Sequence, residues 1–417
     1  MAAWPGEVIE ERAGDIAEAA DALLRHQGAW RHRRVETITV LTHEQLRRHV
    51  SIDFTVPEEH REALRLSAAD EFVVPLALLA KRPLVHFDMR NEEGHSIPLL
   101  TADQHRLIAR ELLYRLLDAD LADQECDDEA VTHAAGELIE AVLADDPQDL
   151  AARIAALEEA FELAPLDDFR RMAQVLSGSF VLWAVVRGLD RRRVFKFALD
   201  EPFAQRAGFD YVYGAPGCTE ALSYHLEVAV PAELKARTTR LWDTATGTVL
   251  AAGERDTDRP ALYYAADPAH LPRRPQVIVT YGAERWRFLG PASIVATVIA
   301  LLVAPPFLFA DLQELAGSAG PAIGLVLSTS AVFSALVLRT DEHALLRLML
   351  VRARLLLVAC TLCALFAAAA LGFQAKPWIL ETTWAVAALV SVVSAGILIS
   401  VAARAPSVRS GPAPEPP

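Results

Sequence analysis

Three residues in one stretch of the chain carry side chains that could hold a metal ion or exchange a proton. His86 and Asp88 share one face of a predicted strand, and His95 follows across a predicted turn. Polar residues on the wet face of a strand give the same pattern by chance, and no ligand spacing supports a site. We therefore assign these residues no catalytic or metal-binding role.

The cysteines offer two further candidates. Cys218 lies in a predicted loop, 214–219, but a nucleophilic thiol needs a nearby base, and none can be assigned from the sequence. Cys360 and Cys363 have the Cys-x-x-Cys spacing of a redox pair. They lie within a hydrophobic run in which small residues recur every four positions, so we interpret them as small packing residues.

An acidic stretch resembles a calcium-binding loop only in part. Asp118, Asp120 and Glu129 match the first, third and twelfth ligands of such a loop, but Ala122 and Asp123 occupy positions where a ligand and a glycine are required. Phosphate-binding loops, dinucleotide fingerprints and hydrolase motifs do not occur in the sequence. We assign no catalytic, cofactor-binding or metal-binding residue and no cofactor, and we expect the protein not to be an enzyme.

The negative charge is concentrated in the segment 118–168, which holds 17 acidic residues and one basic residue, Arg153. The first 287 residues carry 33 basic and 49 acidic groups, because only 7 of 40 and 6 of 55 follow them. Such a region is a poor binder of nucleic acid. The acidic segment is either a docking surface for a basic protein partner or a solvated helical face that keeps the protein soluble.

Four apolar segments predict helices that cross a lipid bilayer, which takes about 20 residues each. They are 288–310, 321–338, 355–373 and 383–403, and none contains Asp, Glu, Lys, Arg or His. Backbone polar groups at membrane depth must bond within their own segment, which favours helices. The sequence therefore predicts a C-terminal bundle of four transmembrane helices that contacts the lipid bilayer.

The basic residues beside these segments predict the orientation of the protein in the membrane. Ten arginines flank the ends that would face the cytoplasm, whereas Lys376 alone lies in the opposite loops. The ten are Arg273, Arg274, Arg285, Arg287, Arg339, Arg347, Arg352, Arg354, Arg404 and Arg409. We expect a multi-pass protein of the inner (plasma) membrane, with both termini and the large N-terminal region in the cytoplasm and no signal peptide.

Two stripes of small residues indicate close helix packing in the membrane. One consists of Cys360, Ala364, Ala368 and Gly372, and the other of Ala387, Ser391 and Ala395. Self-association through these stripes is one expectation. Ion-coupled transporters need charges at membrane depth, and these segments have none. Hydroxyl groups at Ser328, Thr329, Ser330 and Ser334 leave an oligomeric pore as an alternative.

The N-terminal region alternates helix and strand patterns, which predicts an α+β fold. A helix is expected within 1–28, and a strand-rich domain over 29–287 with an acidic helical insertion at about 101–176 that Thr101 and Gln104 begin as a capping box. Period-two alternation favours antiparallel sheets in a β-sandwich-like domain. The expected strands are 35–41, 50–56, 84–90, 95–99, 180–186, 194–199, 222–230, 240–242, 261–264 and 277–281. The tail 405–417 is expected to be disordered.

Three stretches, 50–56, 82–88 with 99–101, and 223–230, resemble a recurring type of multi-pass membrane protein from high-GC bacteria that has an N-terminal strand-rich cytoplasmic domain. The resemblance implies that architecture and no particular activity. Two functions fit the sequence. The first is a membrane-tethered cytoplasmic binding, scaffold or sensor module without catalysis, and the alternative is an oligomeric membrane pore or effector gated by the cytoplasmic domain.

Overall fold

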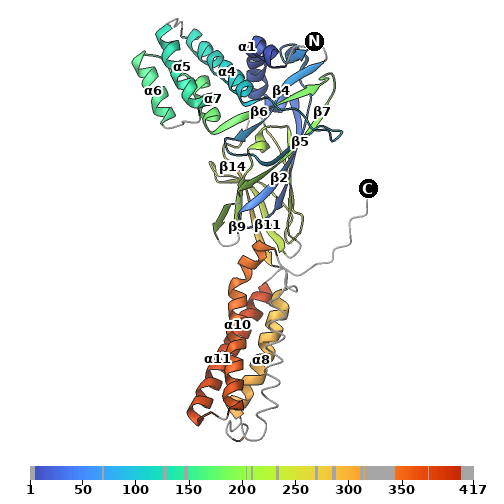
Figure 1. The fold of residues 1–417 in the computed structure, drawn as a ribbon, viewed down its shortest axis with the longest axis vertical. Coiled ribbons are helices and arrows are strands. Elements are labelled where there is room, and N and C mark those ends of the chain that lie inside the picture. The colour runs from blue at the N-terminus through green and yellow to red at the C-terminus, as the bar shows by residue number, and fades with distance from the viewer. Residues whose placement is uncertain are drawn as a thin grey trace.

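In the computed structural model, the strand-rich region and a helical lobe lie at one end of an elongated molecule, and the apolar C-terminal helices form the other end (Figure 1). The structure describes residues 5–67, 70–124, 129–144, 149–202, 204–207, 210–231, 234–267, 271–283, 288–309, 314, 343–373 and 375–404. The predicted second span, 321–338, and the predicted disordered tail, 405–417, lie outside these residues.

Fourteen described strands form three sheets. The six-stranded sheet has the order β13 (Ala261–Ala265), β10 (Ser223–Ala229), β1 (Arg31–Val40), β2 (Gln45–Phe54), β7 (Arg193–Pro202) and β5 (Val85–Arg90). The five-stranded sheet has the order β12 (Thr248–Ala252), β11 (Leu234–Asp243), β14 (Pro275–Ala283), β9 (Asp210–Gly214) and β8 (Ala204–Ala207). The three-stranded sheet is β3 (Arg65–Ser67), β4 (Glu71–Ala80) and β6 (Ser179–Arg187).

The first predicted hairpin is present, with strands longer than the sequence indicates. β1 and β2 pair antiparallel, with Glu36 opposite Val50. The alternation in β10 also corresponds to a strand, but β10 pairs parallel to β1, which corrects the expectation of purely antiparallel sheets. Parallel neighbours need a long crossover, and here most of the N-terminal region intervenes between the two strands.

Two other predicted pairings differ from the structure. β6 and β7 flank the turn at Gly188, whose φ is +66°, but they belong to different sheets, because β6 pairs with β4 and β7 with β2 and β5. The predicted strand 95–99 makes only isolated bridges, from Ser96 to Arg90 and from Leu99 to Ala184. Its turn is present, and Gly94 adopts a φ of +85° there.

Helices α1 (Pro5–Arg25), α4 (Ala102–Ala122) and α7 (Asp167–Gly178) contact the three-stranded sheet. Helix α5 (Glu129–Leu143) packs on α4 and α7, and α6 (Leu150–Ala160) packs on α5 and α7. The short helices are α2 (Gln27–Trp30), α3 (Glu58–Arg61) and η1 (Pro216–Thr219), and η1 contacts β10 and β14. The predicted capping box is formed: Gln104 donates its backbone N–H to Thr101, and Thr101 donates its own to the Gln104 side chain. α1 packs against α4 and contributes Ile9 and Ile16 to the core.

One face of the six-stranded sheet contributes to two hydrophobic cores. Toward the helical lobe, Val50, Ile52 and Phe54 of β2 join the core that includes the three-stranded sheet. Toward the apolar helices, Ile38 and Val40 of β1 join the core that includes the five-stranded sheet. The long strands β1 and β2 therefore tie the two halves of the region together.

The apolar helices are α8 (Gly290–Phe309), α10 (Ala344–Gly372) and α11 (Pro377–Arg404). Of these, α10 and α11 are long and apolar enough to cross a membrane, whereas the apolar stretch of α8 is shorter. α10 begins 11 residues before the predicted span that starts at residue 355. α11 begins 6 residues before the predicted span that starts at residue 383. They start earlier because Leu345, Leu346 and Leu380 extend the buried packing. The described helices thus provide two candidate spans where the sequence predicts four.

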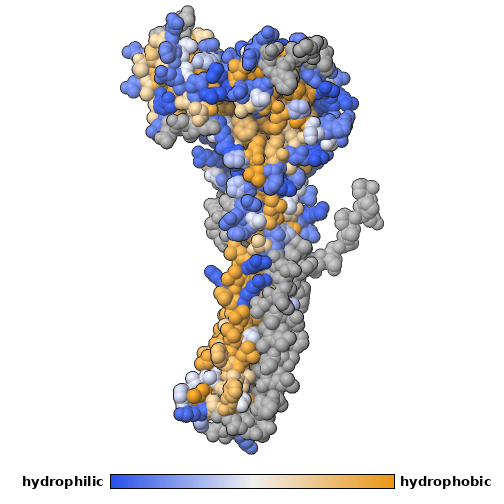
Figure 2. All heavy atoms as spheres, viewed as in Figure 1, coloured by the Kyte–Doolittle hydropathy of each residue, from blue (hydrophilic) through white to orange (hydrophobic). Residues whose placement is uncertain are grey.

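These two helices differ from the core helices of a soluble protein in how little they are buried. The apolar windows of α10 and α11 are 33% and 39% buried, so most of their apolar surface faces outward. Figure 2 shows hydrophobic residues along the helical end of the molecule and a mixture of hydrophilic and hydrophobic residues over the opposite end. Such a surface matches a lipid environment.

Candidate ligand pocket and buried ionic layer

A layer of charged side chains lies on the sheet face that joins the two cores. Arg34 and Glu36 of β1 and Arg48 of β2 point inward, in phase with the apolar residues of the same strands. Arg31 and Glu220 join them, and all five residues are less than 9% exposed. Buried charges are tolerated only when they are paired and hydrogen-bonded, so the geometry of this layer is decisive.

Every member of the ionic layer has an opposite charge beside it. Arg34 donates from Nε to Glu36 Oε1 at 2.7 Å and also contacts Glu220. Arg48 donates to Glu36 Oε2 at 3.1 Å, and the Tyr224 hydroxyl donates to the same oxygen at 3.1 Å. Arg31 lies 3.4 Å from Glu220, and its guanidinium stacks on the Trp30 ring at 4.6 Å.

The layer fills the place where the two smaller sheets separate. Arg31 donates to the carbonyl of Pro75 in β4 at 3.0 Å, and Arg48 donates to the carbonyl of Gly214 in β9 at 3.0 Å. β4 belongs to the three-stranded sheet and β9 to the five-stranded sheet. Guanidinium groups, which have five donors in a plane, thus link one carbonyl of each smaller sheet to the layer.

Charge pairing opposes burial in setting the protonation of this layer. Burial alone would raise the pKa of Glu36, but Arg34 and Arg48 outweigh it and lower that pKa. Burial lowers the pKa of Arg31 to about 10, despite the attraction of Glu220. The carboxylate of Glu36 therefore stays ionised at neutral pH, as its two guanidinium partners require.

Gly217 in η1 leaves room for the Arg34 side chain. A Cβ on Gly217 would lie 2.1 Å from Arg34 Nε and 2.4 Å from its Cζ. Arg34 is held by carboxylates on two sides and cannot move aside without losing one. Only glycine fits at this contact.

The ion pairs continue from the layer to the surface. Glu201 of β7 accepts from Arg48 at 2.9 Å and from Arg82 at 2.6 Å. Arg82, in the loop between β4 and β5, is partly exposed. A run of alternating charges therefore connects Arg31, at one end of the layer, to Arg82, which lines a pocket.

That pocket, here called the α4 pocket, has a volume of about 610 Å³ and lies between α4, α7 and β6. Its lining is mainly apolar and includes four basic side chains. The described lining residues are Lys81, Arg82, Pro83, Ala102, His105, Arg106, Ala109, Leu112, Leu143, Leu176, Ser179, Phe180, Val181 and Trp183. A mostly apolar cavity of this size with a few polar groups is typical of small-molecule sites.

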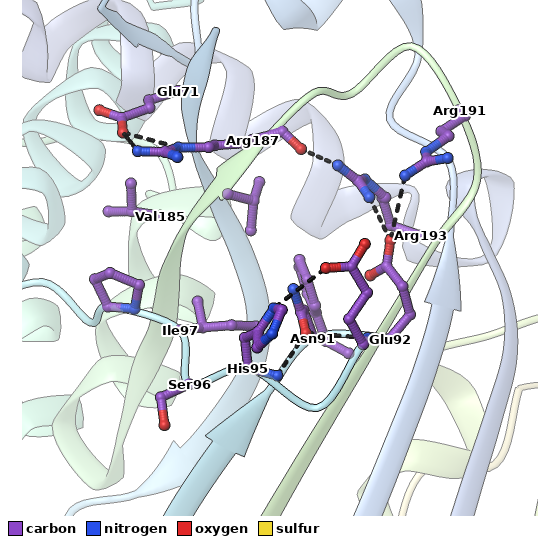
Figure 3. Close-up of a pocket in the computed structure, with 14 residues that line it drawn as sticks. Glu71, Asn91, Glu92, His95, Ser96, Ile97, Val185, Arg187, Arg191 and Arg193 are labelled. Atoms are coloured by element: carbon purple, nitrogen blue, oxygen red, sulfur yellow. Dashed lines mark hydrogen bonds and ion pairs between the residues drawn. The ribbon is translucent and has the colours of Figure 1, made fainter. Parts of the chain in front are cut away.

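A second pocket, of about 410 Å³, lies where the turn after β5 meets β6 and β7 (Figure 3). Its arginines are already neutralised. Arg187 pairs with Glu71, and Arg193 pairs with Glu92, which also lies 3.9 Å from Arg191. Because each guanidinium has a carboxylate partner, this pocket has little net charge to offer a ligand.

The structure separates the histidines and the aspartate that the sequence placed together. His86 Nδ1 lies 2.6 Å from Asp200, Asp88 pairs with Arg90, and His95 Nδ1 lies 3.2 Å from Glu93. His86 also has a φ of +50°, at a bulge in the pairing of β5 with β7. No three His, Cys, Asp or Glu side chains among the described residues gather closely enough to hold a metal ion.

Cys218 is fully buried in η1, where its thiol cannot ionise readily. Burial raises its pKa to about 12, and the negative charges of Glu36 and Glu220 add to the effect. Cys360 and Cys363 are free thiols. Cys360 is buried against α11, where its Sγ lies 3.5 Å from the Ser391 hydroxyl, as expected of a small packing residue.

Part of the acidic segment is neutralised by arginines of neighbouring helices. Glu140 pairs with Arg106 and Arg110, at 2.8 and 2.7 Å. Glu158 pairs with Arg170. Within the calcium-like stretch, Asp120 is helical and accepts the backbone N–H of Phe169 at 2.9 Å, at the start of α7.

Sequence reasoning missed both the ionic layer and the α4 pocket. The layer had a visible signal, because Arg48 is in phase with Val50 and Ile52, and a charge on an apolar face needs a buried partner. The pocket had none, since it forms between segments about 100 residues apart. No protein-family model matches the chain, and no curated protein matches it.

Proposed function

We propose that the protein is a membrane-tethered sensor module, in which the strand-rich region binds a ligand or partner and passes its state to the apolar helices. The observation that supports this is the second hydrophobic core. It contains Tyr281 of β14 and Leu234 of β11 together with Leu345, Leu346 and Leu350 of α10. A flexible tether would leave these leucines exposed, whereas here sheets and helices share one packed interior.

The proposal includes the topology predicted from sequence: a multi-pass bundle of four spans in the inner membrane, with the sheets and both termini in the cytoplasm. The position of the charges supports this orientation. Arg347, Arg352 and Arg354 lie in the first turns of α10, and the Arg354 guanidinium stacks on the Phe288 ring at 5.3 Å. Basic side chains thus gather at the end of the helices that contacts the sheets, and Lys376 lies at the other end.

Two partner proposals accompany this function. The carboxylates of 118–168 that lack an arginine neighbour would form the docking surface for a basic protein. Self-association is the second. The small-residue stripes contact each other within one chain, where Ala364, Ser391 and Ala395 are buried, so a second copy would use the exposed apolar faces. The serines and threonine proposed to line a pore, the alternative function, lie outside the described residues. The core shared by sheets and helices supports the sensor.

Hydrogen exchange of the full-length protein in lipid nanodiscs tests the proposal. Leu346→Asn places an amide in the shared core, and we expect faster exchange in β11 and β14 as well as in α10. Leu348→Asn is the matched control, because Leu348 is 45% exposed on the same helix. If Leu346→Asn leaves the strands unchanged, the sheets and helices are mechanically independent and the sensor function is wrong.

A further inference from the structure

Two arginines near the start of α10 have no opposite charge beside them. Arg347 and Arg352 are exposed, and neither contacts a carboxylate in the part of the chain that the structure describes. The pocket of Figure 3 shows the contrast, because Arg187 and Arg193 there each pair with a glutamate. Arg347 and Arg352 therefore present positive charge to a group from outside the chain.

An exposed apolar stripe runs along α10 and begins between these arginines. Its large side chains are between 45% and 68% exposed and are spaced by seven, seven and four residues, which places them on one side of the helix: Leu348, Leu355, Leu362 and Phe366. At 3.6 residues per turn, Arg347 lies about 100° to one side of Leu348 and Arg352 about 40° to the other. One side of α10 is thus apolar along its length and cationic at its first turns.

The length of α10 places the two arginines at the surface of a bilayer. Gly372, the last residue of the helix, follows Arg352 by 20 residues, which span about 30 Å, the thickness of a hydrocarbon core. Trp378, 66% exposed at the start of α11, is of the residue type that marks the other surface. Arg352 then lies where the hydrocarbon ends, and Arg347 lies about 7.5 Å further out, among the headgroups.

The groups available at that depth are lipid phosphates. A guanidinium binds phosphate through two parallel N–H donors, and it keeps its charge at all physiological pH values. In a zwitterionic lipid the amine of the headgroup cancels the phosphate charge. An anionic phospholipid has no such amine, so it supplies the charge that Arg347 and Arg352 lack within the chain.

The acidic helices do not oppose this attraction. α5 and α6 lie at the end of the molecule remote from α10, with the sheets between them (Figure 1). Salt screens the interaction of exposed charges beyond about 8–10 Å. The local charge at the start of α10, and not the net charge of −15, therefore acts on the lipid surface.

We propose that Arg347 and Arg352 bind the headgroup phosphate of an anionic phospholipid whose acyl chain lies along Leu355, Leu362 and Phe366. The lipid belongs to the leaflet that faces the sheets. This inference rests on the proposed function and its membrane topology, for which it names a partner. Because Leu346 and Leu350 of the same turns belong to the core shared with the sheets, the lipid contacts the segment that joins helices to sheets.

A pair of matched lipids tests the charge requirement. Phosphatidylglycerol and phosphatidylcholine with the same acyl chains differ in net charge. Native mass spectrometry of the full-length protein, in detergent that holds equal amounts of both, should show phosphatidylglycerol retained at least about fivefold more often, the effect of one arginine near an anionic surface. Equal retention of the two lipids, or retention of neither, would overturn the proposal.

Variants then locate the site. Arg347→Gln and Arg352→Gln should each reduce the preference for phosphatidylglycerol, and the double variant should abolish it. Replacing both arginines by lysine should keep most of the preference, because the charge is kept. Arg153→Gln is the control for each single variant, since Arg153 is also an exposed helical arginine without a carboxylate partner among the described residues, but lies in α6. Equal losses in the control, or an unchanged preference in the double glutamine variant, would overturn the site.

A soluble headgroup separates a lipid site from a site for free phosphate. Millimolar glycerol 3-phosphate should leave phosphatidylglycerol bound, because it lacks the acyl chains that contact the stripe. Displacement of the lipid would mean a soluble-anion site and would overturn the proposal. The hydrogen-exchange comparison of the Leu346 and Leu348 variants measures the strands and not the lipid, so failure of the lipid site and failure of the sensor function are distinguishable.

Discussion

Glu36 is the residue on which the ionic layer depends. Its two oxygens accept from Arg34, Arg48 and Tyr224, and it is fully buried. Burying each arginine costs solvation free energy, and the attraction of this carboxylate offsets that cost. Removing the carboxylate would leave two guanidinium groups buried without it.

We therefore expect Glu36→Gln to lower the free energy of unfolding by about 3–5 kcal/mol, the usual effect of breaking a buried ion pair. Chemical denaturation of the detergent-solubilised protein measures this. Glu71→Gln is the control, since its partner Arg187 is 80% exposed and an exposed pair contributes about 1 kcal/mol or less. Equal losses of unfolding free energy in the two variants would show that the buried ion pairs contribute no more than an exposed pair.

Glu36 also predicts a pH dependence. Its pKa is lowered in the folded protein from an ordinary value of 4.5, so its stabilising effect is present above pH 4.5 and is lost as the pH falls through the lowered pKa. Wild type and Glu36→Gln should therefore converge in stability in strong acid, measured by unfolding across the acid range. A difference that persists unchanged to low pH would contradict this assignment.

Cys218 should resist alkylation in the native protein. With a pKa raised to about 12, almost none of its thiol is ionised at pH 8, and burial also hinders the reagent. Iodoacetamide labelling followed by peptide mass spectrometry should find Cys218 unmodified when folded and modified in denaturant. Rapid labelling at pH 8 in the folded state would indicate an accessible, ionised thiol.

At the scale of elements, the contact between α10 and α11 depends on small side chains. Cys360 faces Ser391, Ala364 lies in the same cluster as Ala387, and these residues are at most 2% exposed. The Trp384 indole donates to the carbonyl of Ala367 at 3.1 Å, which adds one polar contact between the same helices. Close approach of the backbones follows from the absence of large side chains.

Ser391→Leu should accordingly destabilise this pair by about 1–3 kcal/mol, because a large side chain is forced into a packed contact. The melting temperature of the detergent-solubilised protein, monitored through its aggregation on heating, measures this change. Val392→Leu is the control, since Val392 is 51% exposed on the same helix. An equal loss of stability in Val392→Leu would show that the contact between α10 and α11 does not depend on a small side chain at Ser391.

At the scale of the whole molecule, the shared core makes the sheets dependent on the helices. Leu241, Val279 and Tyr281 belong to the same cluster as Leu345 and Leu357. A chain ending at residue 283 would expose the sheet side of this cluster. We expect it to aggregate or to melt at a lower temperature than the same region of the full chain, measured by intrinsic fluorescence. Equal melting temperatures would contradict a shared core.

Much of the secondary structure could be predicted from sequence, because it follows local rules. Residue periodicity located β1, β2, β10 and α4, and the capping box at Thr101 marks where α4 begins. The pairing of strands could not be predicted. β6 and β7 are adjacent in sequence but join different sheets, and β10 lies parallel to β1, because pairing depends on which apolar faces meet in space.

The sequence by itself determined the class of the molecule: an acidic region of helices and strands followed by apolar segments that expose hydrophobic surface. These features follow from composition and periodicity, which are read residue by residue. The tertiary structure alone decided the site. Arg34, Glu36, Arg48 and Glu220 meet only where three sheets converge, and the α4 pocket forms only where α4, α7 and β6 approach. Electrostatic pairing and cavity shape depend on distances between distant segments, which no local pattern encodes.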